Sequence, residues 1–219
     1  MDKIIITAFE PFGGDNINPT VKILEQIPDY LYNHRVIKTT LPVVYNHAFD
    51  RLLTLIDKHQ PKLILELGLA KGRSHVNLER IAINVSDATI ADNLGTVLKG
   101  ETIVKNGADG LFSSLPLKKI IKKTKEKKLP VQLSNSAGGY VCNNLFYHTL
   151  HHVKTYNMKT LVGFVHVPML VEQVSDQPNV PSLPRSVMVE AVMTILDTVL
   201  NPIDYKETAQ KIKGAQKAQ

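Results

Sequence analysis

Hydrophobic and polar residues alternate along this chain in blocks that are typical of a sheet covered by helices. Short, nearly continuous apolar runs predict strands at residues 3–7, 35–41, 63–67, 80–85, 131–133 and 161–167. Amphipathic segments with helical spacing predict helices near residues 20–26, 48–59, 117–127, 143–156 and 185–200. Because strands and helices alternate, we predict an α/β fold, a single-domain three-layer α/β/α sandwich with a central, mainly parallel sheet.

The predicted elements end near residue 200, and no repeat or low-complexity linker divides them. We therefore expect a single α/β domain over residues 1–200 and a polar, lysine-rich C-terminal tail over residues 201–219. Residues 177–184 predict a long loop before the last helix. Residues 87–110 have turn residues and only short apolar pairs, which predicts a surface hairpin or an excursion toward a partner subunit.

Composition limits where the protein resides. The chain has 219 residues, of which 43% are hydrophobic, yet no apolar run approaches the roughly 20 residues that a membrane span requires. The first six residues read as a strand and lack the pattern of a signal peptide. A single cysteine cannot form an intrachain disulfide. We therefore expect a cytoplasmic protein with no membrane association.

Lysine carries much of the net charge of +6, concentrated at residues 118–128 and in the polar end at residues 206–219. Nucleic-acid binding would call for stacking aromatics or a recognition motif among these lysines, and neither is present. The charge pattern therefore predicts a solvated helix face and a polar tail, with no nucleic-acid partner.

The only cysteine, Cys142, follows the small-residue turn Gly138-Gly139 at the predicted start of a helix. The first N–H groups of a helix lack acceptors and its dipole is positive there, so a thiolate would be stabilised and the thiol pKa lowered. The same N–H groups could receive the oxyanion of an acyl-transfer intermediate. The alternative is a small apolar residue on the core face of the helix.

A histidine and a carboxylate are the partners that such a thiol would need. His166 lies at the carboxyl end of a predicted strand, where parallel strands gather their chemistry, whereas His148, His151 and His152 follow Cys142 along its own helix. Spacing leaves the carboxylate open among Glu10, Glu66, Glu79, Asp87 and Asp92. The glycine-rich residues 9–15 match neither a P-loop nor a dinucleotide motif, and we expect no cofactor and no metal.

Several motifs occur in order between about Ile4 and about Leu200. They are Thr7-Ala8-Phe9-Glu10-Pro11-Phe12-Gly13-Gly14, Ile17-Asn18-Pro19, Gly72-Arg73, Glu79-Arg80-Ile81-Ala82-Ile83-Asn84, Ser134-Asn135-Ser136-Ala137-Gly138, Tyr140-Val141-Cys142-Asn143, Gly163-Phe164-Val165-His166-Val167-Pro168 and Glu172-Gln173. In these motifs the chain resembles the pyroglutamyl peptidase type I family, also called pyrrolidone-carboxylate peptidases, which are thiol proteases.

This resemblance implies a cysteine exopeptidase that removes an N-terminal pyroglutamyl (5-oxoproline) residue from peptides by acyl transfer. The family's nucleophile falls on Cys142, its general base on His166 and its orienting acid on Glu79. It also implies an α/β/α sandwich that assembles as a homotetramer. The walls of its apolar slot for the lactam ring fall on Phe9, Phe12, Ile90, Tyr140 and Val141.

The chain departs from the family pattern near the expected site. Leu69 replaces a glutamine, Lys71 a glycine and Thr89 an arginine, while Ala8 stands for a glycine and Leu78 for a proline. The three expected catalytic positions are unchanged. If Leu69 lies at the substrate, it removes a polar group there. The alternative function is therefore a divergent paralogue, weakly active or inactive, that binds lactam-capped ligands.

Overall fold

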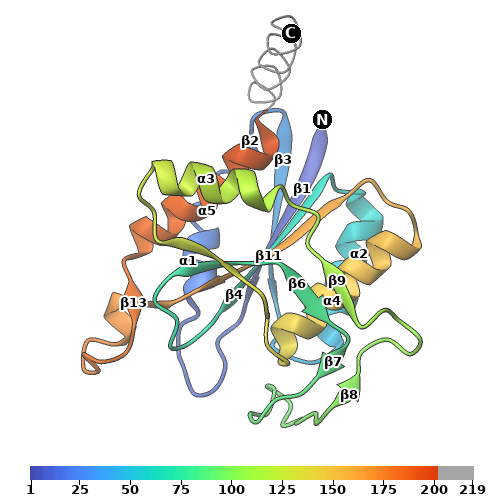
Figure 1. The fold of residues 1–219 in the computed structure, drawn as a ribbon, viewed down its shortest axis with the longest axis horizontal. Coiled ribbons are helices and arrows are strands. Elements are labelled where there is room, and N and C mark those ends of the chain that lie inside the picture. The colour runs from blue at the N-terminus through green and yellow to red at the C-terminus, as the bar shows by residue number, and fades with distance from the viewer. Residues whose placement is uncertain (202–219) are drawn as a thin grey trace, which may run out of the picture.

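A central seven-stranded sheet organises the computed structural model, which describes residues 1–201 (Figure 1). Its strands, in spatial order, are β10 (Val131–Ser134), β5 (Val76–Glu79), β11 (Leu161–Val167), β4 (Leu63–Leu69), β1 (Asp2–Phe9), β3 (His34–Leu41) and β2 (Tyr30–Leu31). Of the tail predicted over residues 201–219, all but Asn201 lies outside the described residues.

The sheet is mainly parallel. Strands β3, β1, β4 and β11 run in one direction, and β10 is parallel to β5. β5 pairs antiparallel with β11, and β2 pairs antiparallel with β3. In β4 all seven residues are buried, as expected for a strand covered on both faces.

Helices cover both faces of the sheet and form two separate cores (Figure 1). On one face pack α1 (Pro19–Leu24), α3 (Leu117–Glu126) and α5 (Arg185–Leu200), and α5 contacts both of the others. On the other face lie α2 (His47–His59) and α4 (Val141–Thr155). The predicted α/β/α fold class is thus confirmed.

One predicted strand differs from the structure. The sequence predicts a strand over residues 80–85, but the chain leaves the main sheet at Arg80. Strand β5 ends at Glu79, and residues beyond Arg80 form two short hairpin ladders over α4. These pair β6 (Ile81–Ile83) with β9 (Gly110–Phe112) and β7 (Val85–Ser86) with β8 (Glu101–Thr102). Residues 87–110 thus connect and partly form these two hairpins, as one of the two alternatives predicted.

The predicted loop over residues 177–184 also contains a short element. Within it, β13 (Ser182–Leu183) pairs in parallel with β12 (Met169–Leu170), and the 3₁₀ turn η1 (Val171–Gln173) follows β12. Among residues 1–201, no helix is both long enough and apolar enough to cross a bilayer. The lysines of α3 lie along a face that is mostly exposed, which confirms the solvated face predicted there.

Candidate active site

Cys142 is the second residue of α4, and the turn before the helix requires glycine. Gly138 has a φ of +81°, a conformation that L side chains rarely adopt. At Gly139 a Cβ would lie 2.3 Å from the carbonyl oxygen of Asp87, whose N–H donates to the Gly139 carbonyl at 2.8 Å. The Gly-Gly pair thus fixes the turn that places the thiol at the helix start.

The sulfur of Cys142 faces the neighbouring ends of β4 and β11. A Cβ at Gly68 would lie 3.0 Å from Sγ, so the absence of a side chain there makes room for the thiol. Gly68 is the register partner of His166 on β11. The cysteine and the histidine predicted from sequence therefore come from adjacent positions of the fold.

A buried carboxylate holds the histidine. Oε1 of Glu79, the last residue of β5, accepts from Nδ1 of His166 at 2.8 Å and from Nη1 of Arg73 at 2.7 Å. Glu79 is fully buried and His166 is 4% exposed. Of the five carboxylates that spacing left open, the structure brings Glu79 to His166.

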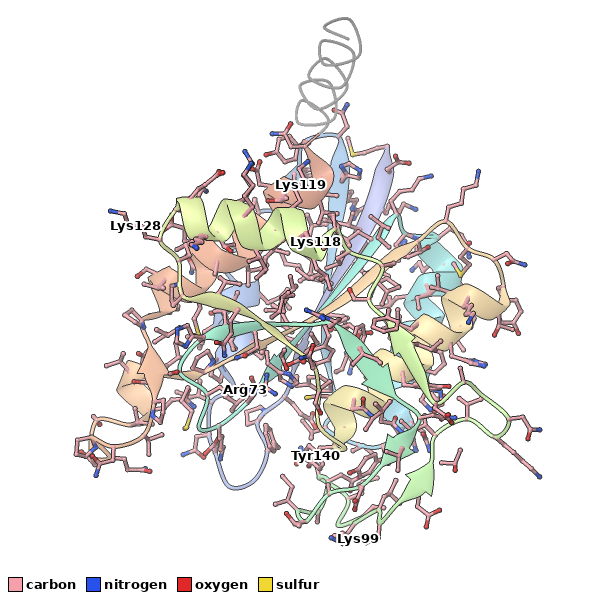
Figure 2. All side chains as sticks on the ribbon, viewed as in Figure 1. Arg73, Lys99, Lys118, Lys119, Lys128 and Tyr140 are labelled. Atoms are coloured by element: carbon pink, nitrogen blue, oxygen red, sulfur yellow. The ribbon has the colours of Figure 1, made fainter. Side chains whose placement is uncertain are left out.

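Arg73 ties this carboxylate to the turn that carries the cysteine. Its second guanidinium nitrogen, Nη2, donates to the carbonyl oxygen of Ser136 at 3.0 Å, and Nη1 also reaches Oγ of Ser134 at 3.3 Å. Figure 2 shows Arg73 and Tyr140 in the lower half of the view, whereas the labelled lysines of α3 lie in the upper half. The sequence motifs include Arg73, but spacing assigned it no role.

Electrostatics leave both reacting groups neutral at rest. Burial lowers the pKa of His166, against its hydrogen bond to Glu79, which raises it. Burial raises the pKa of the Cys142 thiol to about 12, and the carboxyls of Glu79 and Glu66 act in the same direction. The lowered thiol pKa expected from the helix start is therefore wrong for the resting site, because desolvation of the sulfur outweighs the helix terminus.

Aromatic rings stand beside the thiol. The ring of Tyr140, the residue before α4, lies 5.9 Å from that of Phe12 and 5.7 Å from that of Tyr45, centroid to centroid. The Tyr140 hydroxyl donates to the carbonyl oxygen of Ala91 at 2.9 Å, which fixes the ring. The rings of Phe12, Tyr45 and Tyr140 thus form an aromatic wall beside the N-terminus of α4.

The other predicted wall residues separate into three groups. Phe9 and Val141 are buried in the same apolar cluster, against which Phe12, Tyr140 and Cys142 pack. Leu69 is buried in a neighbouring cluster with Met169 and Val174, and Phe12 packs against both clusters. Ile90 lies in an exposed loop with 49% of its surface accessible, outside both clusters.

Of the remaining candidate carboxylates, Glu66 lies in the core, Asp87 is exposed, and Asp92 and Glu10 hold loops. Asp92 accepts from the backbone N–H groups of Tyr45, Leu94 and Thr96. Glu10 accepts from the Val43 N–H at 3.2 Å. No group of three or more His, Cys, Asp or Glu in the described part of the chain is arranged to hold a metal ion.

The fold and these side chains define a class: an α/β/α protein with the thiol, imidazole and carboxylate that cysteine-dependent acyl transfer uses. The sequence model of the pyroglutamyl peptidase family matches residues 2–201. The chain therefore belongs to the pyroglutamyl peptidase family, a family of cysteine peptidases.

Curated and solved relatives support this membership. The chain is 40% identical over 198 residues to a pyrrolidone-carboxylate peptidase of Thermococcus onnurineus, covering 90% of this chain and 98% of the relative. A relative of the same description from Yersinia pestis is 39% identical over 197 residues, covering 89% and 92%.

Among solved structures, the pyroglutamyl peptidase I of Bacillus amyloliquefaciens superposes with a TM-score of 0.86 at 32% identity, covering 91% of this chain and 95% of that one. A mutant pyrrolidone carboxyl peptidase of Pyrococcus furiosus gives 0.87 at 38% identity, covering 92% and 99%.

Proposed function

We propose that this protein is a cysteine exopeptidase that removes an N-terminal pyroglutamyl residue from peptides by acyl transfer. The observation that carries the proposal is the placement of Cys142 at the start of α4, facing the sheet edge where Glu79 holds His166 at 2.8 Å. The names of the relatives supply the substrate class.

The first half of the reaction begins with two neutral groups. Nδ1 of His166 is engaged by Glu79, which leaves Nε2 to take the proton of the Cys142 thiol. The sulfur then attacks the pyroglutamyl carbonyl carbon, and the carbonyl oxygen becomes an oxyanion. The unpartnered N–H groups at the start of α4 stabilise that oxyanion. The imidazolium gives its proton to the departing amine as the C–N bond breaks.

The second half releases the acyl group. A water molecule gives a proton to Nε2 of His166 and its oxygen attacks the thioester carbonyl. Collapse of the tetrahedral intermediate breaks the C–S bond, and the proton returns to sulfur. Free pyroglutamate leaves. Glu79 stabilises the imidazolium in both halves, because its buried carboxylate lies against Nδ1.

A raised pKa of the resting thiol is compatible with this proton transfer. A neutral thiol and a neutral imidazole carry no net charge into a dehydrated site, so burial costs little at rest. The charges appear only during the reaction, when Glu79 lies on one side of the imidazolium and the helix start lies at the sulfur. We therefore place the activation of Cys142 in the transfer step.

The aromatic wall suits a lactam. The pyroglutamyl ring carries no charged amine, so rings such as Phe12 and Tyr140 can cover it without desolvating a charge. A prolyl residue carries an ammonium group, and none of the side chains that form this wall is a carboxylate that could pair with it. We therefore expect strong preference for pyroglutamyl over prolyl substrates.

Assembly and compartment are further parts of the proposal. The loop that follows β7 exposes Ile90, Leu94 and Val97, at 49%, 67% and 43% of their surfaces. Apolar side chains grouped in this way favour contact between subunits, as in a homotetramer. We propose that the homotetramer acts in the cytoplasm, where a single thiol stays reduced. Light scattering at several protein concentrations measures the assembly.

The test compares the native chain with Cys142→Ser on fluorogenic amides of pyroglutamate and proline. We expect the native chain to release the fluorophore from the pyroglutamyl amide only, and Cys142→Ser to release none. His166→Ala serves as the second variant, and Glu79→Gln should retain more activity than either. Binding without turnover by the native chain would favour the alternative, a protein that holds lactam-capped ligands.

A further inference from the structure

Tyr45 differs from Tyr140, which is half-buried at the candidate site, and from Tyr147, which is buried farther along α4. It is 5% exposed, and its hydroxyl oxygen is buried without a hydrogen-bond partner among the described residues. By contrast, the hydroxyl of Tyr140 donates to Ala91 and that of Tyr147 donates to the carbonyl oxygen of Ala108 at 2.5 Å. Buried polar groups are nearly always paired, so an exception calls for an explanation.

The backbone around Tyr45 is fixed on several sides. Its N–H donates to Oδ2 of Asp92 at 3.1 Å, and its carbonyl accepts from the N–H of His47 at 2.7 Å. Asn46, the next residue, has a φ of +63° and accepts at Oδ1 from Asn144 of α4 at 3.5 Å. The segment between β3 and α2 is thus held against the start of α4, which fixes the backbone position of Tyr45 beside the candidate site.

The ring of Tyr45 stands at the aromatic wall of the site. It meets the Tyr140 ring edge-on, with an interplanar angle of 84° and a centroid distance of 5.7 Å. Burial raises the pKa of the Tyr45 hydroxyl, and Tyr140, Asp92 and Cys142 add to this effect. The hydroxyl therefore keeps its proton and remains a donor across the working pH range.

A lactam ring would bring the acceptor that this hydroxyl lacks. The ring carbonyl is neutral, and leaving it unpaired inside an apolar wall would weaken binding. The side chains of Phe12, Val141 and Leu69 have no donor, and the Tyr140 hydroxyl is already used by Ala91.

We propose that the Tyr45 hydroxyl donates a hydrogen bond to the ring carbonyl of the bound pyroglutamyl residue and so determines specificity for the lactam. This inference rests on the proposed function and adds a specificity-determining residue to it. In the free protein the hydroxyl stays unpaired, and it is paired only when the lactam enters.

The test is Tyr45→Phe, which removes only the oxygen, with Tyr147→Phe as the matched loss of a buried but paired hydroxyl. Two amides of the same fluorophore report on the ring: the pyroglutamyl amide and the cyclopentanecarbonyl amide, whose ring lacks the lactam groups. The ratio measured is kcat/KM for the pyroglutamyl amide divided by kcat/KM for the cyclopentanecarbonyl amide. We expect Tyr45→Phe to lower this ratio by about 10- to 100-fold. Tyr147→Phe should leave the ratio unchanged.

Thermal unfolding separates this role from a structural one. Tyr45→Phe should keep or raise Tm because it removes an unpaired buried group, whereas Tyr147→Phe should lower Tm. An unchanged substrate ratio in an active Tyr45→Phe variant overturns the inference alone. Equal losses on both substrates also overturn it and assign the hydroxyl to the oxyanion. If the native chain cleaves neither amide, the proposed function fails and this inference with it.

Discussion

Glu66 makes the stability of this protein depend on pH in a direction opposite to that of most carboxylates. The side chain lies in β4 and is fully buried. Its Oε1 accepts from Oγ1 of Thr149 at 2.6 Å, while its Oε2 has no partner among the described residues. Thr7, its register partner on β1, also has an unpaired hydroxyl. Burial raises the pKa of Glu66 to about 8, although the Thr149 hydrogen bond acts against the rise.

The sign and size of the effect follow from proton binding. In the unfolded chain Glu66 loses its proton near its ordinary pKa of 4.5, and in the native state it keeps the proton to about pH 8. Between these values the native state binds more protons, so raising the pH favours unfolding. The 3.5-unit difference between these pKa values, at about 1.36 kcal/mol per unit, corresponds to about 5 kcal/mol of unfolding free energy.

Glu66→Gln removes this dependence, because glutamine resembles the protonated acid and does not ionise. Urea unfolding of the native chain and the variant at pH 4.5, 6, 7 and 8.5 measures the difference. We expect similar stability at the lowest pH and an advantage for the variant that grows to about 5 kcal/mol at the highest. Glu190→Gln on the exposed surface of α5 is the control. A difference that stays constant with pH would refute the reasoning.

Three further predictions concern the site. Arg73→Met should raise the pKa of His166, because Arg73 contributes to its lowering, and should move the acid limb of the kcat/KM profile to higher pH; an unmoved limb would count against this role of Arg73. Leu69→Gln should lower KM with little change in kcat if residue 69 contacts the ring, and unchanged KM would place it outside the pocket. Iodoacetamide labelling of Cys142 should still accelerate above pH 8.5, the range of a free thiol, and a plateau near neutrality would show a resting thiolate instead.

The regular part of the fold could be predicted from the pattern of apolar residues. Strands β1, β3, β4 and β11, and the five α-helices within residues 1–201, lie close to where that pattern places them. The strand predicted at residues 80–85 was wrong. The main sheet contains residues 76–79 instead, and the apolar residues that follow form a separate hairpin. Strand β5 carries the polar residues Asn77 and Glu79, and Glu79 binds His166 at the site. Its run of apolar residues is therefore interrupted, and the strand is harder to predict from sequence.

The chemistry of the site was only partly visible in the sequence. Strand ends predicted Cys142 and His166 at one edge of a parallel sheet. In the structure β10, which precedes Cys142, is parallel to β5, and β5 runs antiparallel to β11. The turn and helix start after β10, rather than a shared strand direction, bring the thiol to the paired residues Gly68 and His166. Spacing could not choose Glu79, because the antiparallel pairing of β5 with β11 depends on tertiary contacts. The thiol pKa was predicted in the wrong direction, because burial of the sulfur is a property of packing. Tyr45 carried no signal, since an unpaired hydroxyl is recognised only in three dimensions.

The central claim is that Cys142 forms a thioester with the pyroglutamyl group, using the proton-accepting pair of His166 and Glu79. Rapid acid quenching of the native chain during turnover of a pyroglutamyl ester, followed by mass spectrometry of the digested protein, tests it most directly. We expect one added pyroglutamyl group on the peptide that contains Cys142, and none in Cys142→Ser. Undiminished turnover by Cys142→Ser, or the acyl group on another residue, would contradict it.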